Sequence, residues 1–225
     1  MRLTDHIDTA GTSVSQKVAD GLVRMILDGT LKPGERVREA VIAADLGLSR
    51  NTVREAVRLL ENTGLVRYIF NKGLVIWNPD DADVVDVYKA RLQLELAAVA
   101  SVDDATDFTS VHGAFDQFLE ALKTHDVRSI VEADLAIHQA IVGLMGSERL
   151  NGYYAQLMNE LRYFLLVLSI DHREYVDTAA LEEEHRTIID ALMLRDPAHA
   201  REILAGIIEE NRDAVREILK KRTTA

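Results

Sequence analysis

The chain has 225 residues, no cysteine and a formal net charge of −11. The absence of cysteine excludes disulfides and thiolate metal sites, so imidazole and carboxylate groups are the strong metal ligands that remain. The sequence has neither an apolar run of eighteen residues nor a charged start followed by an apolar segment, and it therefore predicts a cytoplasmic protein without membrane contact.

The charge is divided unevenly along the chain. Residues 1–79 carry 11 Lys/Arg and 9 Asp/Glu, whereas residues 80–225 carry 15 and 28. The length suits one small and one medium domain, and we place the boundary at Pro79, because proline disfavours regular structure before it and the following Asp80 and Asp81 suit a helix start. Phosphate repels an acidic domain, so nucleic-acid binding is expected in residues 1–79.

Two helices are predicted before residue 48. Ser13 and Gln16 form a capping-box signature, and the apolar line that follows it closes near Gly29. Residues 40–46 form a short second helix that Gly47 ends.

A third helix begins at Ser49, a capping residue, and ends near Gly64. Its apolar residues recur at i, i+3, i+4 and i+7: Val53, Ala56, Val57 and Leu60. Another face carries polar residues whose groups suit bases and phosphates: Arg50, Asn51, Thr52, Arg54 and Arg58. Arginines at this spacing also occur on ordinary solvated helix faces, so the helix alone does not decide the function.

Two β-prone runs follow, residues 68–70 and 74–77, separated by a turn sequence that contains Lys72 and Gly73. The order of three helices and a hairpin predicts a winged helix-turn-helix, in which the third helix enters a DNA groove and Lys72 at the wing tip contacts a phosphate.

The stretch from Leu31 to Val66, with LKPGERVRE, LGLSR and VREAVRLLENTGLV, resembles the GntR-type winged-helix transcription regulators. The resemblance implies that DNA is contacted by the start of the third helix and by the wing tip, at Ser49, Arg50, Asn51, Thr52, Arg54 and Gly73. Three departures leave the operator sequence open. Ala40 replaces an arginine that many members use on DNA, with Arg38 as the nearest substitute. Asn51-Thr52 replaces a common Thr-Pro, and Ile69-Phe70 stands where basic residues or proline are common.

Residues 80–225 read as helical. Breaks near residues 102–103, 125–126, 146–147, 172–177 and 195–197 divide them into about six helices, and Asp196-Pro197 is the clearest helix start. We therefore expect a mainly α protein, in which an all-α antiparallel helical bundle follows the winged helix-turn-helix.

Three residues of this second part suit a metal ion. Asp134 and His138 lie four residues apart, on one face of a helix, and His185 offers a third ligand from another helix. The same pattern also fits a hydrogen-bonded Asp–His pair and a structural histidine.

The runs ARLQLELAAVA, DLAIH and EEEHRTIIDALMLRDPAHARE resemble the FadR C-terminal ligand domain, called FCD. This resemblance implies a zinc, nickel or manganese ion held by Asp134, His138, His185 and a fourth histidine. Ile207 occupies the place of the fourth ligand, with Glu210 and Asn211 as the nearest polar neighbours.

The same resemblance implies that Arg91 binds the carboxylate of a small metabolite. From its position one turn away, Tyr88 is expected to add a hydroxyl group, and Arg162 is a weaker second candidate. The alternative for Arg91 is a surface ion pair with Glu95, four residues on.

We therefore predict a DNA-binding regulator, acting as a repressor, that forms a homodimer on a pseudo-palindromic operator and responds to a small carboxylate. The alternatives are a metal-dependent hydrolase-like domain and a dimer whose second domain is a scaffold without a sensing role. No Gly-rich phosphate loop, nucleophile elbow or HExxH signature is present, so no enzyme is expected.

Overall fold

The computed structural model describes residues 13–168 and 177–224. The chain divides into two compact units, Met1–Asn78 and Pro79–Ala225, one residue before the boundary that we predicted. Among the described residues, none of the helices combines the length and the apolar character that crossing a membrane requires.

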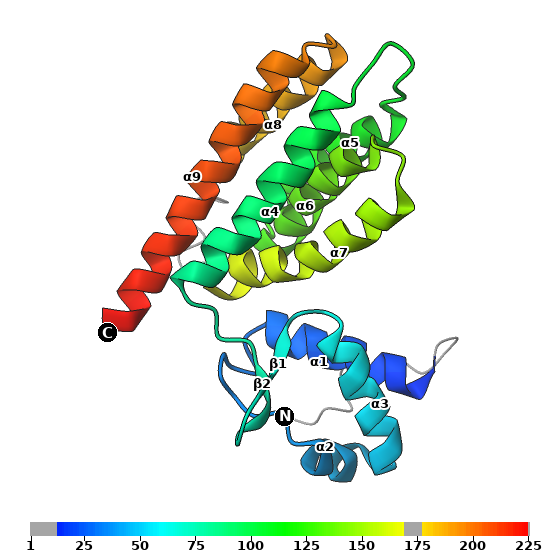
Figure 1. Cartoon of the computed structure of the whole chain (residues 1–225), viewed down its shortest axis with the longest axis vertical. Coiled ribbons are helices and arrows are strands. Elements are labelled where there is room, and N and C mark those ends of the chain that lie inside the picture. The colour runs from blue at the N-terminus through cyan, green and yellow to red at the C-terminus, as the bar shows by residue number, and fades with distance from the viewer. Residues whose placement is uncertain (1–12, 169–176, 225) are drawn as a thin grey trace. The chain divides into compact units, whose positions relative to one another are not determined.

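In its described part, residues 13–78, the first unit contains three helices and a two-stranded antiparallel sheet (Figure 1). The helices are α1 (Val14–Leu27), α2 (Glu39–Leu46) and α3 (Arg50–Glu61), and the strands are β1 (Val66–Ile69) and β2 (Gly73–Ile76), with Val66 opposite Ile76. This order confirms the predicted winged helix-turn-helix fold.

Local capping explains where these elements begin and end. The Ser49 hydroxyl accepts a hydrogen bond from the Thr52 amide at 3.2 Å, and Gly47 ends α2 with a φ of 64°. The third helix ends at Glu61, before the predicted Gly64, where the Thr63 hydroxyl donates to the Leu60 carbonyl. Gly64 has a φ of 77° and lies at the turn into β1.

The wing strands lie earlier in the sequence than predicted. They end at Ile69 and Ile76, one residue before the predicted ends, because residues 70–72 form the turn. In that turn the Lys72 amide donates to the Ile69 carbonyl, and Asn71 adopts a φ of 64°.

The core of the first unit lies between α1 and α3. The predicted apolar stripe of α3 is buried, as are Val18, Leu22 and Ile26 of α1. Burying each of these larger side chains contributes about 1.5–3 kcal/mol, which fixes the orientation of α3 and leaves its other face exposed.

The second unit is a bundle of helices. They are α4 (Asp81–Ala100), α5 (Thr109–Thr124), α6 (Val127–Gly143), α7 (Glu148–Tyr163), α8 (Thr178–Met193) and α9 (Pro197–Thr224), and a π-helical segment, Phe164–Leu168, continues α7. The helix number in the described part agrees with the prediction. The predicted break at residues 172–177 lies outside the described residues except for Asp177, which caps α8.

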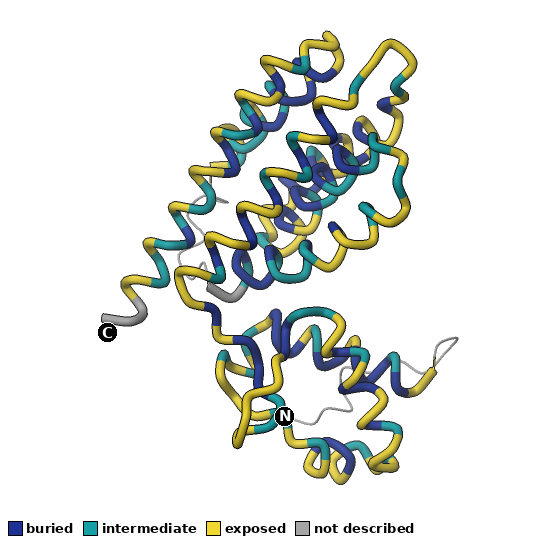
Figure 2. The backbone as a smooth tube through the Cα atoms, viewed as in Figure 1, coloured by how far each residue is buried: buried dark blue, intermediate teal, exposed yellow. Residues whose placement is uncertain are grey.

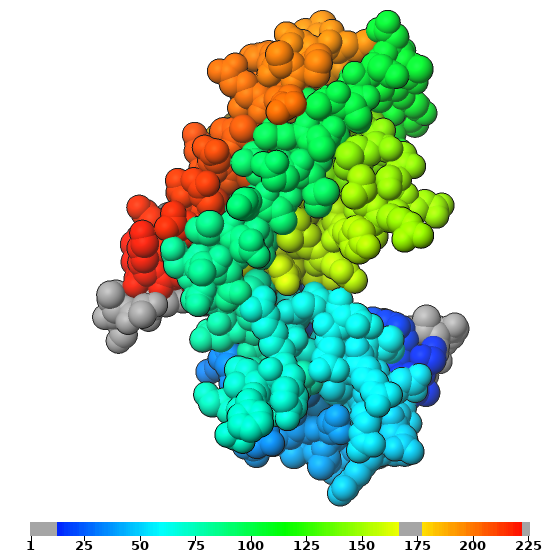
Figure 3. All heavy atoms as spheres, viewed as in Figure 1, coloured from blue at the N-terminus to red at the C-terminus, as the bar shows by residue number. Residues whose placement is uncertain are grey.

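Within the bundle, α4 packs against α9, α6 and α7, and α5 packs against α6 and α8. Figure 2 shows the buried positions of each helix on one side of its coil, and Figure 3 shows side chains of α4 and α9 meeting along the visible face. An ion pair at the surface, Arg216 with Asp81 at 2.7 Å, joins α9 to the start of α4. The interior of this bundle contains buried polar and charged side chains: Arg91, Glu95, Asp134, His138 and His185.

Candidate functional site

One face of α3 is exposed and polar. Arg50, Asn51, Arg54 and Arg58 lie on it, opposite the buried stripe. The Arg54 Nε lies 3.6 Å from Glu39 Oε2 in an exposed pair, which holds the guanidinium only weakly. The predicted Ser49 caps the helix, and its hydroxyl lies 2.9 Å from that of Thr52. The first turn therefore combines hydroxyl, amide and guanidinium groups at one end of the helix.

A groove of about 640 Å³ lies beside this face, between α2, α3 and the wing. Four arginines line it, Arg36, Arg38, Arg54 and Arg58, together with Glu39, Glu61 and Tyr68. Arginine predominates over glutamate, so the groove suits an anionic partner.

Arg36 was not among the residues that we predicted from the sequence. It pairs with Val75 of the wing through an isolated β-bridge, and a Cβ atom added at Gly73 would lie 3.4 Å from its Nη2. The predicted Gly73 has a φ of 77°, and Lys72 is exposed beside it. The wing thus brings Arg36, distant from the third helix in sequence, to the same groove.

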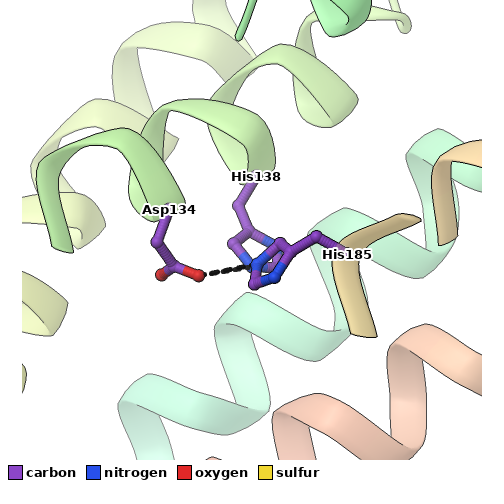
Figure 4. A group of neighbouring side chains, drawn as sticks. All are labelled: Asp134, His138 and His185. Atoms are coloured by element: carbon purple, nitrogen blue, oxygen red, sulfur yellow. Dashed lines mark ion pairs between the residues drawn. The ribbon is translucent and has the colours of Figure 1, made fainter. Parts of the chain in front are cut away.

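The second cluster lies inside the bundle, where Asp134, His138 and His185 come together (Figure 4). Asp134 and His138 belong to α6 and His185 to α8, and all three are buried. The Asp134 Oδ1 atom lies 2.7 Å from His185 Nε2 and 3.9 Å from His138 Nε2. Around a tetrahedral zinc ion, N and O ligand atoms about 2.0–2.2 Å from the metal are about 3.3–3.6 Å apart, and the two distances lie on either side of that separation.

The hydrogen bonds of the two imidazoles direct their free nitrogens toward Asp134. His185 Nδ1 lies 2.8 Å from the Leu181 carbonyl and His138 Nδ1 lies 2.7 Å from Glu95 Oε2, so each Nδ1–H donates and each Nε2 is the atom that a neutral ring would offer to a metal ion. Both Nε2 atoms are buried: that of His138 has no hydrogen-bond partner, and that of His185 has the Asp134 carboxylate 2.7 Å away. Three electron-donating atoms therefore meet in a buried space, which is an arrangement that a cation stabilises.

Glu95 connects this triad to Arg91. Its carboxylate accepts hydrogen bonds from Arg91 Nε at 2.8 Å, from His138 Nδ1 and from the Tyr154 hydroxyl. Arg91 and Glu95 have side-chain exposures of 1% and 0%, so the surface-pair alternative for Arg91 is wrong. The ion pair is part of the bundle core.

The pKa values in this cluster follow from burial and the neighbouring charges. Burial alone would raise the pKa of both carboxyl groups, but the imidazoles and Arg91 outweigh it and hold the pKa of Glu95 and of Asp134 at about 2. Burial alone would lower the pKa of His185, yet hydrogen bonding to Asp134 raises it. Metal binding requires neutral imidazoles, and Arg91, Glu95 and Asp134 would then leave one negative charge for a divalent cation to offset.

The predicted effector residues Tyr88 and Arg91 are buried, whereas Arg162 is only partly buried and pairs with other side chains. Tyr88 is buried, stacks on Phe164 and has the Arg91 guanidinium 5.9 Å from its ring centre. The Arg91 Nη2 atom is buried without a hydrogen-bond partner. Arg162, the weaker candidate, binds Glu132 at 2.7 Å and Asn159 at 3.0 Å instead.

A cavity of about 310 Å³ opens beside Asp134. Four carboxylates line it, Asp134, Asp177, Glu184 and Glu210, together with Asn211 and an apolar wall that includes Ile207. Burial raises the pKa of Glu184, and the nearby Asp134 and Glu210 add to that effect. Ile207 therefore lies at the same cavity as the triad.

Comparisons with known proteins agree with this division of the chain. Residues 14–76 match the family model described as bacterial regulatory proteins, gntR family, and residues 86–210 match the FCD domain. A probable D-xylose utilization operon transcriptional repressor of Paenarthrobacter nicotinovorans is 32% identical over 86% of this chain and 84% of its own. The gluconate operon transcriptional repressor of Bacillus subtilis is 22% identical over 92% and 86%.

A solved structure of a transcriptional regulator described as GntR, from Rhodococcus sp. RHA1, is also similar to this chain. It is 31% identical, covers 91% of this chain and 98% of its own, and superimposes with a TM-score of 0.77. The matching families and these relatives are regulators of transcription and not enzymes.

Proposed function

Because this chain belongs to the gntR family of bacterial transcriptional regulators and carries an FCD domain, we propose that it is a cytoplasmic repressor controlled by a metabolite. Its first unit would bind a pseudo-palindromic operator as a homodimer, since one winged helix covers only half a site. Its second unit would bind a small carboxylate together with a divalent metal ion. The exposed face of α3 beside the arginine-lined groove is the observation that carries the DNA-binding part.

Arg50 and Arg54 are proposed to contact base edges and phosphates from α3, with Ser49, Asn51 and Thr52 at the same helix end. Arg38, Lys72 and Gly73 would hold the flanking backbone, because guanidinium, ammonium and backbone N–H groups are the usual phosphate donors. The acidic bundle would stay away from phosphate, so the basic groups of the first unit carry the binding.

Replacing Arg50 or Arg54 with alanine should weaken operator binding by about tenfold or more each, because one arginine–base or arginine–phosphate interaction contributes about 1–3 kcal/mol. Fluorescence anisotropy on DNA selected by the wild-type protein from a random pool measures this loss. Arg128→Ala, an exposed arginine at the start of α6, is the matched control and should bind like the wild type. Full affinity in both α3 variants would exclude α3 as the reading helix.

The metal part of the proposal rests on the buried Nε2 atoms of His138 and His185 facing Asp134. These three residues would hold the ion, and Glu95 would orient His138 through its Nδ1–H. A bound zinc, nickel or manganese ion would supply positive charge and an open coordination position for an effector carboxylate. Ile207 has no ligand atom, so three protein ligands are proposed.

The effector is proposed to enter the cavity beside Asp134, whose 310 Å³ fits a small metabolite. Among the described residues, its lining carries four carboxylates and no basic group, and we propose that these repel an anion until a cation is bound. Arg91 does not line this cavity, but its buried Nη2 has no hydrogen-bond partner, and its charge is proposed to add attraction for a carboxylate. We therefore expect the metal to bind before the carboxylate.

This order of binding has a measurable consequence. In thermal-shift measurements on a panel of small carboxylates, a responsive compound should stabilise zinc-loaded protein and leave chelator-treated protein unchanged. Glu184→Gln and Glu210→Gln should strengthen the response, because each removes one negative charge from the cavity lining. Equal stabilisation with and without metal would contradict the proposed order, and silence across the panel would favour the scaffold alternative.

Control of DNA binding is proposed to follow from a difference in effector affinity between two arrangements of the dimer. The unit boundary at Asn78 and Pro79 is where the arrangement would change. Operator affinity measured with and without a responsive carboxylate tests this coupling directly.

A further inference from the structure

The wing exposes large apolar side chains that the fold does not use. Tyr68 and Phe70 are 72% and 81% exposed, and Ile69 between them is 42% exposed. Aromatic side chains usually bury most of their surface, so two exposed rings within three residues suggest a contact outside the described chain.

These rings adjoin the arginine-lined groove. Tyr68 lines the groove together with Leu74, its partner across the hairpin, and Phe70 stands two residues further along, at the start of the wing turn. Lys72 is exposed in the same turn, and Arg36 lies against Gly73. The apolar tip is therefore continuous with a surface that carries four guanidinium groups.

This combination favours DNA over another protein surface. Basic groups bind phosphates, while an apolar ring fits between the sugars and base edges of the minor groove, where Phe, Leu and Ile act as wedges in other DNA-binding proteins. The groove is also continuous with the proposed reading face of α3, because Arg54 and Arg58 belong to both.

We propose that Phe70, supported by Tyr68, is an apolar wedge that enters the minor groove beside the bases read by α3, partly unstacks one base step and bends the operator. Lys72 and Arg36 bind the phosphates on either side of the insertion. The inference rests on the proposed DNA-binding function and adds a specificity element to it. Flexible pyrimidine–purine steps are expected under each wing, because they unstack most readily.

The experiment uses the full-length protein and DNA that it selects from a random pool. 2-Aminopurine placed at successive positions reports unstacking as a rise in fluorescence, and circular-permutation electrophoresis reports bending. Wild-type protein should give one fluorescence maximum per half-site, under the wing. Phe70→Ala should abolish that maximum, reduce the bend and weaken binding by about tenfold, and Tyr68→Ala should have a smaller effect.

Two further variants test whether the effect of Phe70→Ala comes from the lost wedge, and not from misfolding or from the loss of any exposed apolar side chain. Phe70→Leu keeps an apolar wedge and should retain most of the bend. Leu194→Ala removes an apolar side chain that is 80% exposed in the second unit and should bind and bend DNA like the wild type.

The possible results separate the Phe70 wedge proposal from the proposal that this protein binds DNA. Wild-type bending and affinity in Phe70→Ala, with binding still lost in Arg50→Ala, would reject the wedge and leave the DNA-binding proposal intact. A Phe70→Ala protein that changes its oligomeric state without DNA would identify the wing as a contact between copies and also reject the wedge. If the wild-type protein selects no sequence, both proposals fail.

Discussion

Replacing Glu95 with alanine should lower the free energy of unfolding by about 3–5 kcal/mol, because it removes one partner of a buried ion pair. The Arg91 guanidinium would remain in the core without its counter-charge, and the Tyr154 hydroxyl and His138 Nδ1–H would each lose their acceptor. Zinc affinity should also fall about 10–100-fold, since His138 loses the group that orients it. Urea denaturation of chelator-treated protein measures the change in the free energy of unfolding without any contribution from bound metal.

Two comparison variants show how much of this loss comes from leaving the Arg91 charge unpaired. The double variant Arg91→Met with Glu95→Leu removes both charges and should be more stable than Glu95→Ala alone. Arg216→Ala breaks an ion pair of similar length at the surface, with Asp81, and should cost less than about 1 kcal/mol. A loss for Glu95→Ala no larger than that for Arg216→Ala would show that leaving the Arg91 charge unpaired in the core carries no large cost.

The fold was predictable from sequence where its signals are local. Ser49, Gly47 and the i, i+3, i+4 stripe act within a few residues, so the start of α3 and the end of α2 agree with the prediction, whereas α3 ends before the predicted Gly64. The wing strands were misplaced because the hairpin register depends on how residues 70–72 turn, which a β-prone run does not specify. Arg36 was missed because only the bridge to Val75 brings it to the groove.

The bundle site was only partly predictable for the same reason. The Asp134 and His138 spacing pointed to a shared face, but Glu95 contacts His138 from 43 residues away and Tyr154 contacts Glu95 from 59 residues away. The spacing of Arg91 and Glu95 is identical for a surface pair and a buried pair. Burial depends on how α4 packs against α6 and α7, and that packing is a tertiary property.

Replacing Ile207 with histidine should tighten zinc binding by roughly 100-fold. Ile207 is buried at the same cavity as Asp134, so an imidazole there would face the proposed ion as a fourth ligand. Structural zinc sites with four ligands bind with about 10–16 kcal/mol, or roughly 3 kcal/mol per ligand, and each 1.4 kcal/mol is a factor of ten. Competition against a chromophoric chelator measures the affinity, and Ile207→Val is the control that keeps three ligands and the apolar wall.

Moving one histidine ligand from position 185 to position 207 tests whether both positions reach the same metal ion. His185→Ala alone should lose zinc affinity by a similar factor, and His185→Ala combined with Ile207→His should recover most of it, because the site again has three protein ligands. Recovery requires that both imidazoles reach the same ion. If Ile207→His folds but binds zinc no more tightly than the wild type, Ile207 does not occupy the fourth position. If His185→Ala binds zinc as the wild type does, the buried triad is a hydrogen-bonded core cluster without a metal, and the carboxylate-lined cavity must then recognise a cationic or neutral effector.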